Sequence, residues 1–150
     1  MTSMPPGGAV PYEVIIPSAA RPALLDRVLT SLLTFVDLPP QMVRVHDDAA
    51  FPGRQGDVCN VVQAAGVQFR VPTMLTLQDP PVFHGPALWR LLQATATEFV
   101  LYSQDDHEVL RPLPVADALA VMRVCPDVHQ IRFNKRKTMA AKHADTPNPW

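Results

Sequence analysis

The hydrophobic positions along the chain alternate between two spacings. Residues 13–16 form a short apolar run that is typical of a β-strand, and Pro17 is expected to end it. From Pro22 onward, apolar residues recur about every 3.6 positions, which predicts an amphipathic helix with proline in its first turn. This helical pattern consists of Leu24, Leu25, Val28, Leu29, Leu32, Leu33 and Val36. The chain is therefore predicted to begin with a strand that is followed by a helix.

The same alternation continues along the rest of the sequence. Further strands are predicted at residues 42–46, 67–71, 99–102 and 129–133. Helices are predicted at residues 57–65, closed by Gly66, at residues 86–95, and beyond Pro114. Strands that alternate with helices indicate an α/β fold, with a mostly parallel, Rossmann-like sheet flanked by helices. We expect a single domain at residues 12–137, with a flexible leader at 1–11 and a C-terminal tail at 138–150.

Composition and charge narrow the class of protein. The chain is 47% hydrophobic, which indicates a globular protein. Its formal net charge of -1 gives no strong positive electrostatic field that would attract nucleic acid. Cys59 and Cys125 show no metal-site spacing, which favours reduced thiols in a cytoplasmic protein. The sequence shows no signal peptide and no run of about 18 apolar residues, so no secretion and no transmembrane segment are predicted.

Two acidic pairs follow predicted strands. Asp47 and Asp48 come after the second strand, and Asp105 and Asp106, within FVLYSQDDHEVL, come after the fourth. Because parallel sheets bind ligands beyond the carboxyl ends of their strands, we expect both pairs at one edge of the sheet. Adjacent carboxylates repel each other, and a cation or a solvated turn relieves that repulsion. Mg2+ and Mn2+ favour such oxygen ligands together with phosphates and water.

Three segments of the chain follow one another in the order VIIPSAARPALLDRVLTSLL, VRVHDD and TEFVLYSQDDHEVL. In their order and spacing they resemble the nucleotide-sugar-binding half of GT-A-fold glycosyltransferases, particularly those of the family 2 type. The resemblance covers roughly residues 12–137. It implies a metal-dependent enzyme that transfers a sugar from a nucleotide-diphospho-sugar donor to an acceptor, which would be a glycan, a lipid or a protein. It also implies Mn2+ or Mg2+ as the cation that bridges the donor diphosphate.

The resemblance further implies roles for individual residues. The acids after the second strand correspond to base or ribose contacts, and the acids after the fourth strand correspond to a metal site with a histidine nearby. No catalytic base can be assigned in this way. The implied nucleotide-sugar contacts are Pro17, Arg21, Asp47, Asp48 and Asp105, and the implied metal ligands are Asp105, Asp106 and His107.

The chain departs from the family pattern in two respects. Gln104 stands where many relatives carry an acid, so it adds no charge to the predicted metal site. In addition, no segment after the acidic motif matches the region that carries the catalytic base of inverting members. The chain is then a fragment that ends before the acceptor region, a very short member, or a non-catalytic nucleotide-sugar-binding module. A nucleotidyltransferase is a third hypothesis. Such enzymes usually have a glycine-rich phosphate loop after the first strand, and PSAARP is a poor match to one.

Simpler explanations stay open for several of these residues. Acids that follow a strand also cap helices or lie solvated in turns. His84 and Gly85 precede a predicted helix whose free amides would face a phosphate, although the helix start alone explains them. The basic residues 135–137 would meet the diphosphate or an anionic acceptor, or form a solvated surface. Trp89 is expected to pack in the core.

Overall fold

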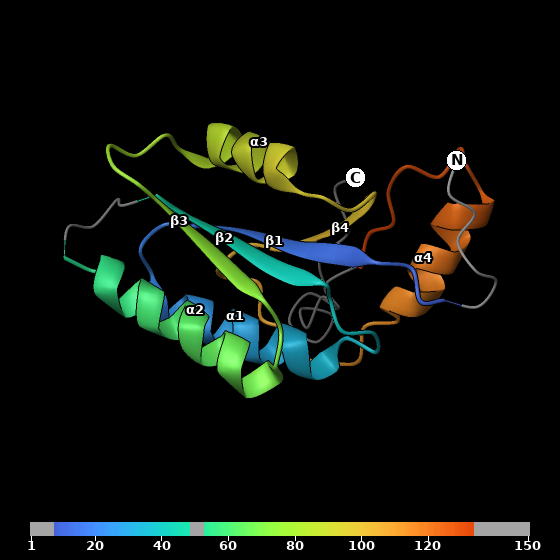
Figure 1. Ribbon diagram of the computed structural model, residues 1–150, viewed down its shortest axis with the longest axis horizontal. Coiled ribbons are helices and arrows are strands. Elements are labelled where there is room, and N and C mark those ends of the chain that lie inside the picture. The colour runs from blue at the N-terminus through green and yellow to red at the C-terminus, as the bar shows by residue number, and fades with distance from the viewer. Residues whose placement is uncertain (1–7, 49–52, 134–150) are drawn as a thin grey trace, which may run out of the picture.

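The computed structural model describes residues 8–48 and 53–133 of the chain. Strands and helices alternate along the described residues, as the hydrophobic pattern predicts (Figure 1). Most of the predicted leader, the tail at 138–150 and the basic residues 135–137 lie outside the described residues. The elements are β1 (Tyr12–Ser18), α1 (Pro22–Phe35), β2 (Met42–Asp48), α2 (Gln55–Phe69), β3 (Thr73–Gln78), α3 (His84–Ala94), β4 (Phe99–Tyr102) and α4 (Val115–Val124).

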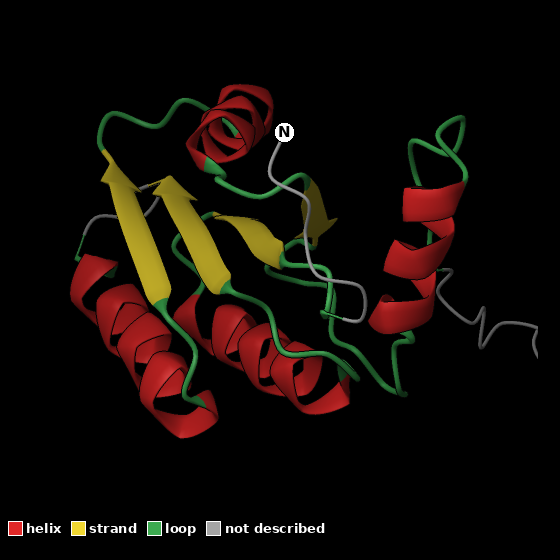
Figure 2. Cartoon of the chain, turned by 45° about the vertical axis from the view of Figure 1, so that its right-hand side comes forward, coloured by secondary structure: helices red, strands yellow, loops and turns green. Residues whose placement is uncertain are grey.

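The four strands form one parallel sheet in the order β3-β2-β1-β4. Helices α1 and α2 cover one face of this sheet, and α3 lies over the other face (Figures 1 and 2). The chain winds outward from β1 to β3, then crosses back through α3 to place β4 on the other side of β1. The winding therefore reverses between β1 and β4, which is the switch point where sheets of this class bind ligands. The predicted α/β class with a parallel sheet is confirmed.

The hydrophobic core lies between the sheet and the helices α1 and α2. Alternate residues of a strand face the same side, so every second strand residue points toward these two helices. The strand residues include Val14, Ile16, Val43 and Val45, and they pack with Leu25, Val28, Leu29, Val58 and Val62 of the two helices. The pattern of apolar residues that predicts α1 is thus the face that α1 buries.

The opposite face of the sheet carries buried polar groups. The Arg44 guanidinium pairs with the Glu13 carboxylate across β1 and β2, and Glu13 also accepts a hydrogen bond from the Ala96 N–H at 2.9 Å. Burial by itself would raise the pKa of Glu13, but the hydrogen bonds and the charge of Arg44 outweigh it and hold that pKa below its usual value. These contacts tie the α3–β4 connection to the centre of the sheet.

Strand β1 runs two residues further than predicted, through Pro17 to Ser18. The carbonyl of Ile15 accepts a hydrogen bond from the Ser103 N–H at 3.1 Å, on the side of β4. Pro17, two residues later, faces the same side, beyond the last β1–β4 pair of Ile15 with Tyr102. The missing N–H of proline therefore costs no ladder hydrogen bond at this position.

Other predicted boundaries are wrong. Helix α2 begins at Gln55, passes through Gly66 and ends at Phe69, so the strand predicted at residues 67–71 is helical in its first part. Strand β3 forms instead at Thr73–Gln78, after Pro72. Helix α3 begins at His84, before the predicted start at residue 86.

The strand predicted at residues 129–133 does not form. These residues have no regular secondary structure, and Phe133 packs against the hydrophobic core without pairing to β4. Trp89 is also not in the core, since it is 61% exposed. Ala87 and Leu91 occupy the buried face of α3 instead, and Trp89 lies on the solvent side of the helix.

Candidate functional site

A cleft of about 380 Å3 opens where the carboxyl ends of β1, β2 and β4 meet the start of α3. It lies at the switch point between β1 and β4, so its position follows from the order of the strands. The lining residues come from four segments that are far apart in the sequence. They are Pro17, Ser18, Ala19 and Arg21, then Asp48, then Pro81, Phe83, His84 and Ala87, then Gln104 and Asp105.

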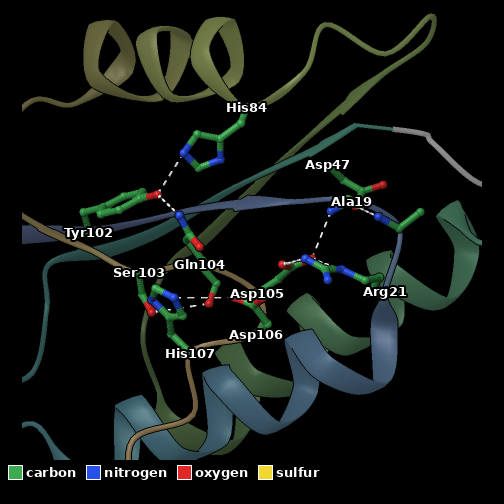
Figure 3. Close-up of polar contacts among 11 residues, drawn as sticks. Ala19, Arg21, Asp47, His84, Tyr102, Ser103, Gln104, Asp105, Asp106 and His107 are labelled. Carbon is green, nitrogen blue, oxygen red and sulfur yellow. Dashed lines mark hydrogen bonds and ion pairs between the residues drawn. The ribbon is translucent and has the colours of Figure 1, made fainter. Parts of the chain in front are cut away.

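Asp105 joins the ends of β1 and β4. Its Oδ2 atom accepts hydrogen bonds from the Ala19 N–H at 3.0 Å and from Arg21 Nε at 3.1 Å (Figure 3). Its Oδ1 atom pairs with Arg21 Nη2. The Asp105 side chain is only 3% exposed, whereas that of Arg21 is 39% exposed. The paired carboxylate therefore fixes the direction of a guanidinium that still reaches the cleft.

The neighbouring acids of β2 point to opposite faces of the sheet, as consecutive strand residues must. The Asp47 Oδ1 atom accepts a hydrogen bond from the Ala20 N–H at 2.8 Å, at the turn that leads into α1. The Asp48 Oδ1 atom accepts one from the Val82 N–H at 3.2 Å, before α3. Only Asp48 of this pair lines the cleft. Asp47 lies behind the cleft wall and supports the turn between β1 and α1.

The turn that Asp47 supports is under backbone strain, because Ala20 has a φ of 53°. Burial raises the pKa of Asp47, and the charges of Asp105 and Asp48 act in the same direction, against the hydrogen bond from Ala20. Among the described residues, the Asp47 Oδ2 and Ser18 Oγ atoms are buried without a hydrogen-bond partner.

His46 lies two residues before Asp48 on the same face of β2. It is buried, and burial lowers the pKa of its imidazole.

Asp106 and His107 follow Asp105 in the turn after β4. The Asp106 carboxylate is 47% exposed, and its Oδ1 atom lies 3.6 Å from His107 Nε2. Within residues 8–48 and 53–133, no group of three His, Cys, Asp or Glu side chains is arranged to hold a metal ion. The side chains of Asp105, Asp106 and His107 therefore do not form a complete cation site by themselves. They fit a Mg2+ or Mn2+ ion that shares one carboxylate with substrate phosphates and water.

Gln104 takes part in a chain of hydrogen bonds that crosses the cleft toward α3. Its Nε2 atom donates to the Tyr102 hydroxyl at 2.7 Å, and that hydroxyl lies 3.0 Å from His84 Nε2 (Figure 3). Gln104 thus links the end of β4 to the start of α3, a task that the amide performs without adding charge. Sequence reasoning missed Tyr102 and predicted no side-chain contact for His84, because the contact depends on how α3 lies over the sheet.

Most of the residues that the sequence predicts for the site are brought together. Pro17, Arg21, Asp48 and Asp105 line one cleft, with Asp106 in the adjoining turn. Sequence reasoning also missed Phe83, which lines the same cleft from the segment before α3. An exposed aromatic residue in a connecting segment carries no periodic signal that would have singled it out.

Comparison with solved structures finds a similar fold in a mannosyltransferase, PcManGT from Pyrobaculum calidifontis, in complex with GDP-Man and Mn2+. The match has a TM-score of 0.62 at 19% sequence identity. The chain has a glycosyltransferase-like fold. The match covers 78% of this chain and 33% of the mannosyltransferase, so the chain spans about a third of that protein's length. No protein-family model matches the sequence, and no curated protein does.

Cys59 and Cys125 are both free. In the part of the chain that the structure describes, no helix has the length and apolar character needed to cross a membrane.

Proposed function

We propose that the chain is a metal-dependent glycosyltransferase of the family 2 type, which transfers a sugar from a nucleotide-diphospho-sugar to an acceptor. The observation that carries this proposal is the cleft at the switch point, with Arg21, Asp48 and Asp105 in its walls. Parallel sheets of this kind bind nucleotides at that point. The similarity to the fold of a mannosyltransferase that was solved with GDP-Man and Mn2+ supports the same conclusion. With both cysteines free, we place the activity in the cytoplasm.

The cleft residues divide the recognition of such a donor between them. Arg21 Nε and Nη2 are engaged by Asp105, so the remaining N–H groups of the guanidinium would meet the oxygens of the donor diphosphate. Asp105 is a positioning residue that holds Arg21 and the end of β1 through the hydrogen bonds described above. Asp48, at the end of β2, would contact the nucleoside, and Pro17 also lines the cleft. Asp47 supports the turn after β1 from outside the cleft.

Asp106 is the carboxylate that would hold a divalent cation, with His107 beside it and Asp105 as the neighbouring acid. The other ligands would be donor phosphates and water, because the protein supplies too few groups by itself. When bound, Mn2+ or Mg2+ neutralises charge on the departing nucleoside diphosphate.

Titration calorimetry with GDP and UDP tests this proposal. The wild-type chain should bind at least one of them in the presence of Mn2+ and lose most of that affinity when a chelator is added. Asp106→Ala should weaken Mn2+-dependent binding at least about tenfold, because a metal ligand is lost. Glu108→Ala is the matched control, since this carboxylate lies in the same turn but pairs with Arg27 outside the cleft.

The results separate the parts of the proposal. Unchanged Mn2+-dependent binding by a folded Asp106→Ala variant would contradict the metal assignment. Failure of the wild-type chain to bind either nucleotide under any condition would contradict the donor site.

A non-catalytic nucleotide-sugar-binding module is the second candidate function. It is favoured by Asp105, whose two carboxylate oxygens are already engaged by Arg21 and Ala19. Release of GDP from GDP-mannose, or of UDP from UDP-glucose, in the presence of Mn2+ separates the two candidates. Binding without release supports the module, and slow metal-dependent release supports the enzyme.

A further inference from the structure

Phe83 lines the cleft in an unusual backbone conformation. Its φ is 66° and its ψ is 174°, a combination that glycine adopts and that other residues avoid. For a bulky side chain this is a true outlier. The sequence nevertheless has phenylalanine here, directly before α3.

Packing of the ring does not explain this conformation. Phe83 is 78% exposed and does not belong to the hydrophobic core. Single exposed apolar residues are common on protein surfaces, but here an exposed ring, a strained backbone and a place in a cleft wall coincide. Strained residues concentrate at ligand sites, where the surrounding structure holds them in place.

The neighbours of Phe83 supply that support. The preceding residue, Val82, donates its N–H to Asp48 Oδ1, and the Phe83 carbonyl accepts a hydrogen bond from the Ala87 N–H at 3.1 Å. The following residue, His84, contacts the Tyr102 hydroxyl at 3.0 Å. The backbone that carries the ring is therefore tied to the ends of both β2 and β4. Because this backbone is already fixed, a ligand that contacts the ring would lose little free energy to ordering it.

The chemistry of the surrounding wall indicates what the ring contacts. Asp48 lines the cleft close to Phe83, and a carboxylate accepts hydrogen bonds from N–H donors. Nucleobases such as guanine and uracil carry ring N–H donors on one edge and a flat face that stacks on aromatic side chains. A sugar or a phosphate group alone does not combine these two features.

We propose that Phe83 is the stacking platform for the nucleobase of the donor, with Asp48 beside it to accept an N–H of that base. This inference rests on the proposed function and specifies its ligand as a nucleoside diphosphate. The strained backbone places the ring at the cleft, and the ring replaces water on one face of the base.

The test compares GDP and UDP with pyrophosphate, which has the phosphates but no base, in the presence of Mg2+. Phe83→Ala should weaken binding of the nucleoside diphosphate about 5- to 140-fold, which corresponds to a stacking contribution of about 1–3 kcal/mol. Pyrophosphate affinity should stay unchanged. Phe83→Tyr should bind the nucleotide as the wild type does, because the aromatic face is retained.

Two further variants separate stacking from a structural role. Trp89→Ala removes another exposed aromatic residue of the same region, outside the cleft lining, and should leave all affinities unchanged. Phe83→Gly removes the ring and relieves the strain, so it should melt no lower than Phe83→Ala and bind the nucleotide as weakly.

The outcomes distinguish this inference from the function on which it rests. Unchanged nucleotide affinity in Phe83→Ala, or an equal loss for nucleotide and pyrophosphate, would overturn the stacking role and leave the donor site standing. A wild-type chain that binds no nucleoside diphosphate would overturn the proposed function and this inference together.

Discussion

Asp47 shows how burial changes the role of a single carboxylate. The side chain is fully buried and accepts a hydrogen bond from the Ala20 N–H. Burial raises its pKa above the ordinary value of 3.8, with the charges of Asp105 and Asp48 acting in the same direction. The folded protein therefore holds this proton more tightly than the unfolded chain does. The stabilisation from that proton is complete below the unfolded pKa and is lost as the pH rises through the folded pKa.

Asp47→Asn should therefore stabilise the protein at neutral pH. The amide oxygen can still accept from the Ala20 N–H, and the new NH2 group can donate to the buried Ser18 Oγ. We expect the gain in free energy of unfolding, measured by urea denaturation, to shrink from neutral pH toward about pH 4. Asp26→Asn, on the exposed side of α1, serves as the control and should change stability little. A gain that is the same at both pH values would contradict this account.

Helix α2 shows how contact between elements overrides a local signal. Glycine is a common helix terminator, yet α2 continues past Gly66 and ends only before Arg70, which has a φ of 52°. A Cβ atom built on Gly66 would lie 3.0 Å from two side-chain atoms of Thr73 and 3.2 Å from the Val71 carbonyl oxygen. Glycine fits at this position because α2 closely approaches the start of β3, where a methyl group would crowd Thr73 and the Val71 carbonyl.

Two glycines of α2 should consequently respond to alanine in opposite ways. Gly56→Ala places the methyl group in open space and should raise the free energy of unfolding by about 0.5–1 kcal/mol, through helix propensity. Gly66→Ala should lower it by about 1–3 kcal/mol, because the backbone oxygen of Val71 cannot move aside as a flexible side chain would. Urea denaturation of both variants measures the difference. A gain of stability in Gly66→Ala would contradict the close approach of α2 to β3.

The two faces of the sheet differ across the whole molecule. The face under α1 and α2 is an apolar layer up to Asp47 at the end of β2, whereas the face under α3 includes the Glu13–Arg44 pair and the buried His46. Helix α3 covers this second face alone among the described helices, as Figure 2 shows. We infer that the stability of the domain resides mainly in the first layer, and that the layer which bounds the cleft is held more weakly.

Leucine truncations in the two layers should therefore differ in cost. Leu29→Ala, in the core under α1, should lower the free energy of unfolding by about 2–5 kcal/mol. Leu91→Ala, under α3, should cost less, because its neighbours Trp89 and Leu92 are exposed and water can reach the space. Native-state hydrogen exchange should show α3 amides opening at lower free energy than α1 amides. Equal costs and equal protection would contradict the division into two layers.

The sequence alone determined the order of the elements in the first two thirds of the chain and the α/β class, because the spacing of apolar residues follows directly from which face each element buries. It also determined that the acidic pairs lie near the carboxyl ends of strands. Where it failed, at residues 67–71 and 129–133, a short apolar run had to be assigned without knowledge of its partner.

Only the tertiary structure decided which residues share the cleft. The hydrogen bonds between Arg21 and Asp105 join residues 84 positions apart, and they depend on β4 lying beside β1. The contrast between Asp47 and Asp48 depends on the face to which each points, and the contribution of Phe83 depends on where α3 begins. Local patterns specify elements because they reflect burial near in sequence, whereas a site forms from side chains that only the packing of those elements brings together.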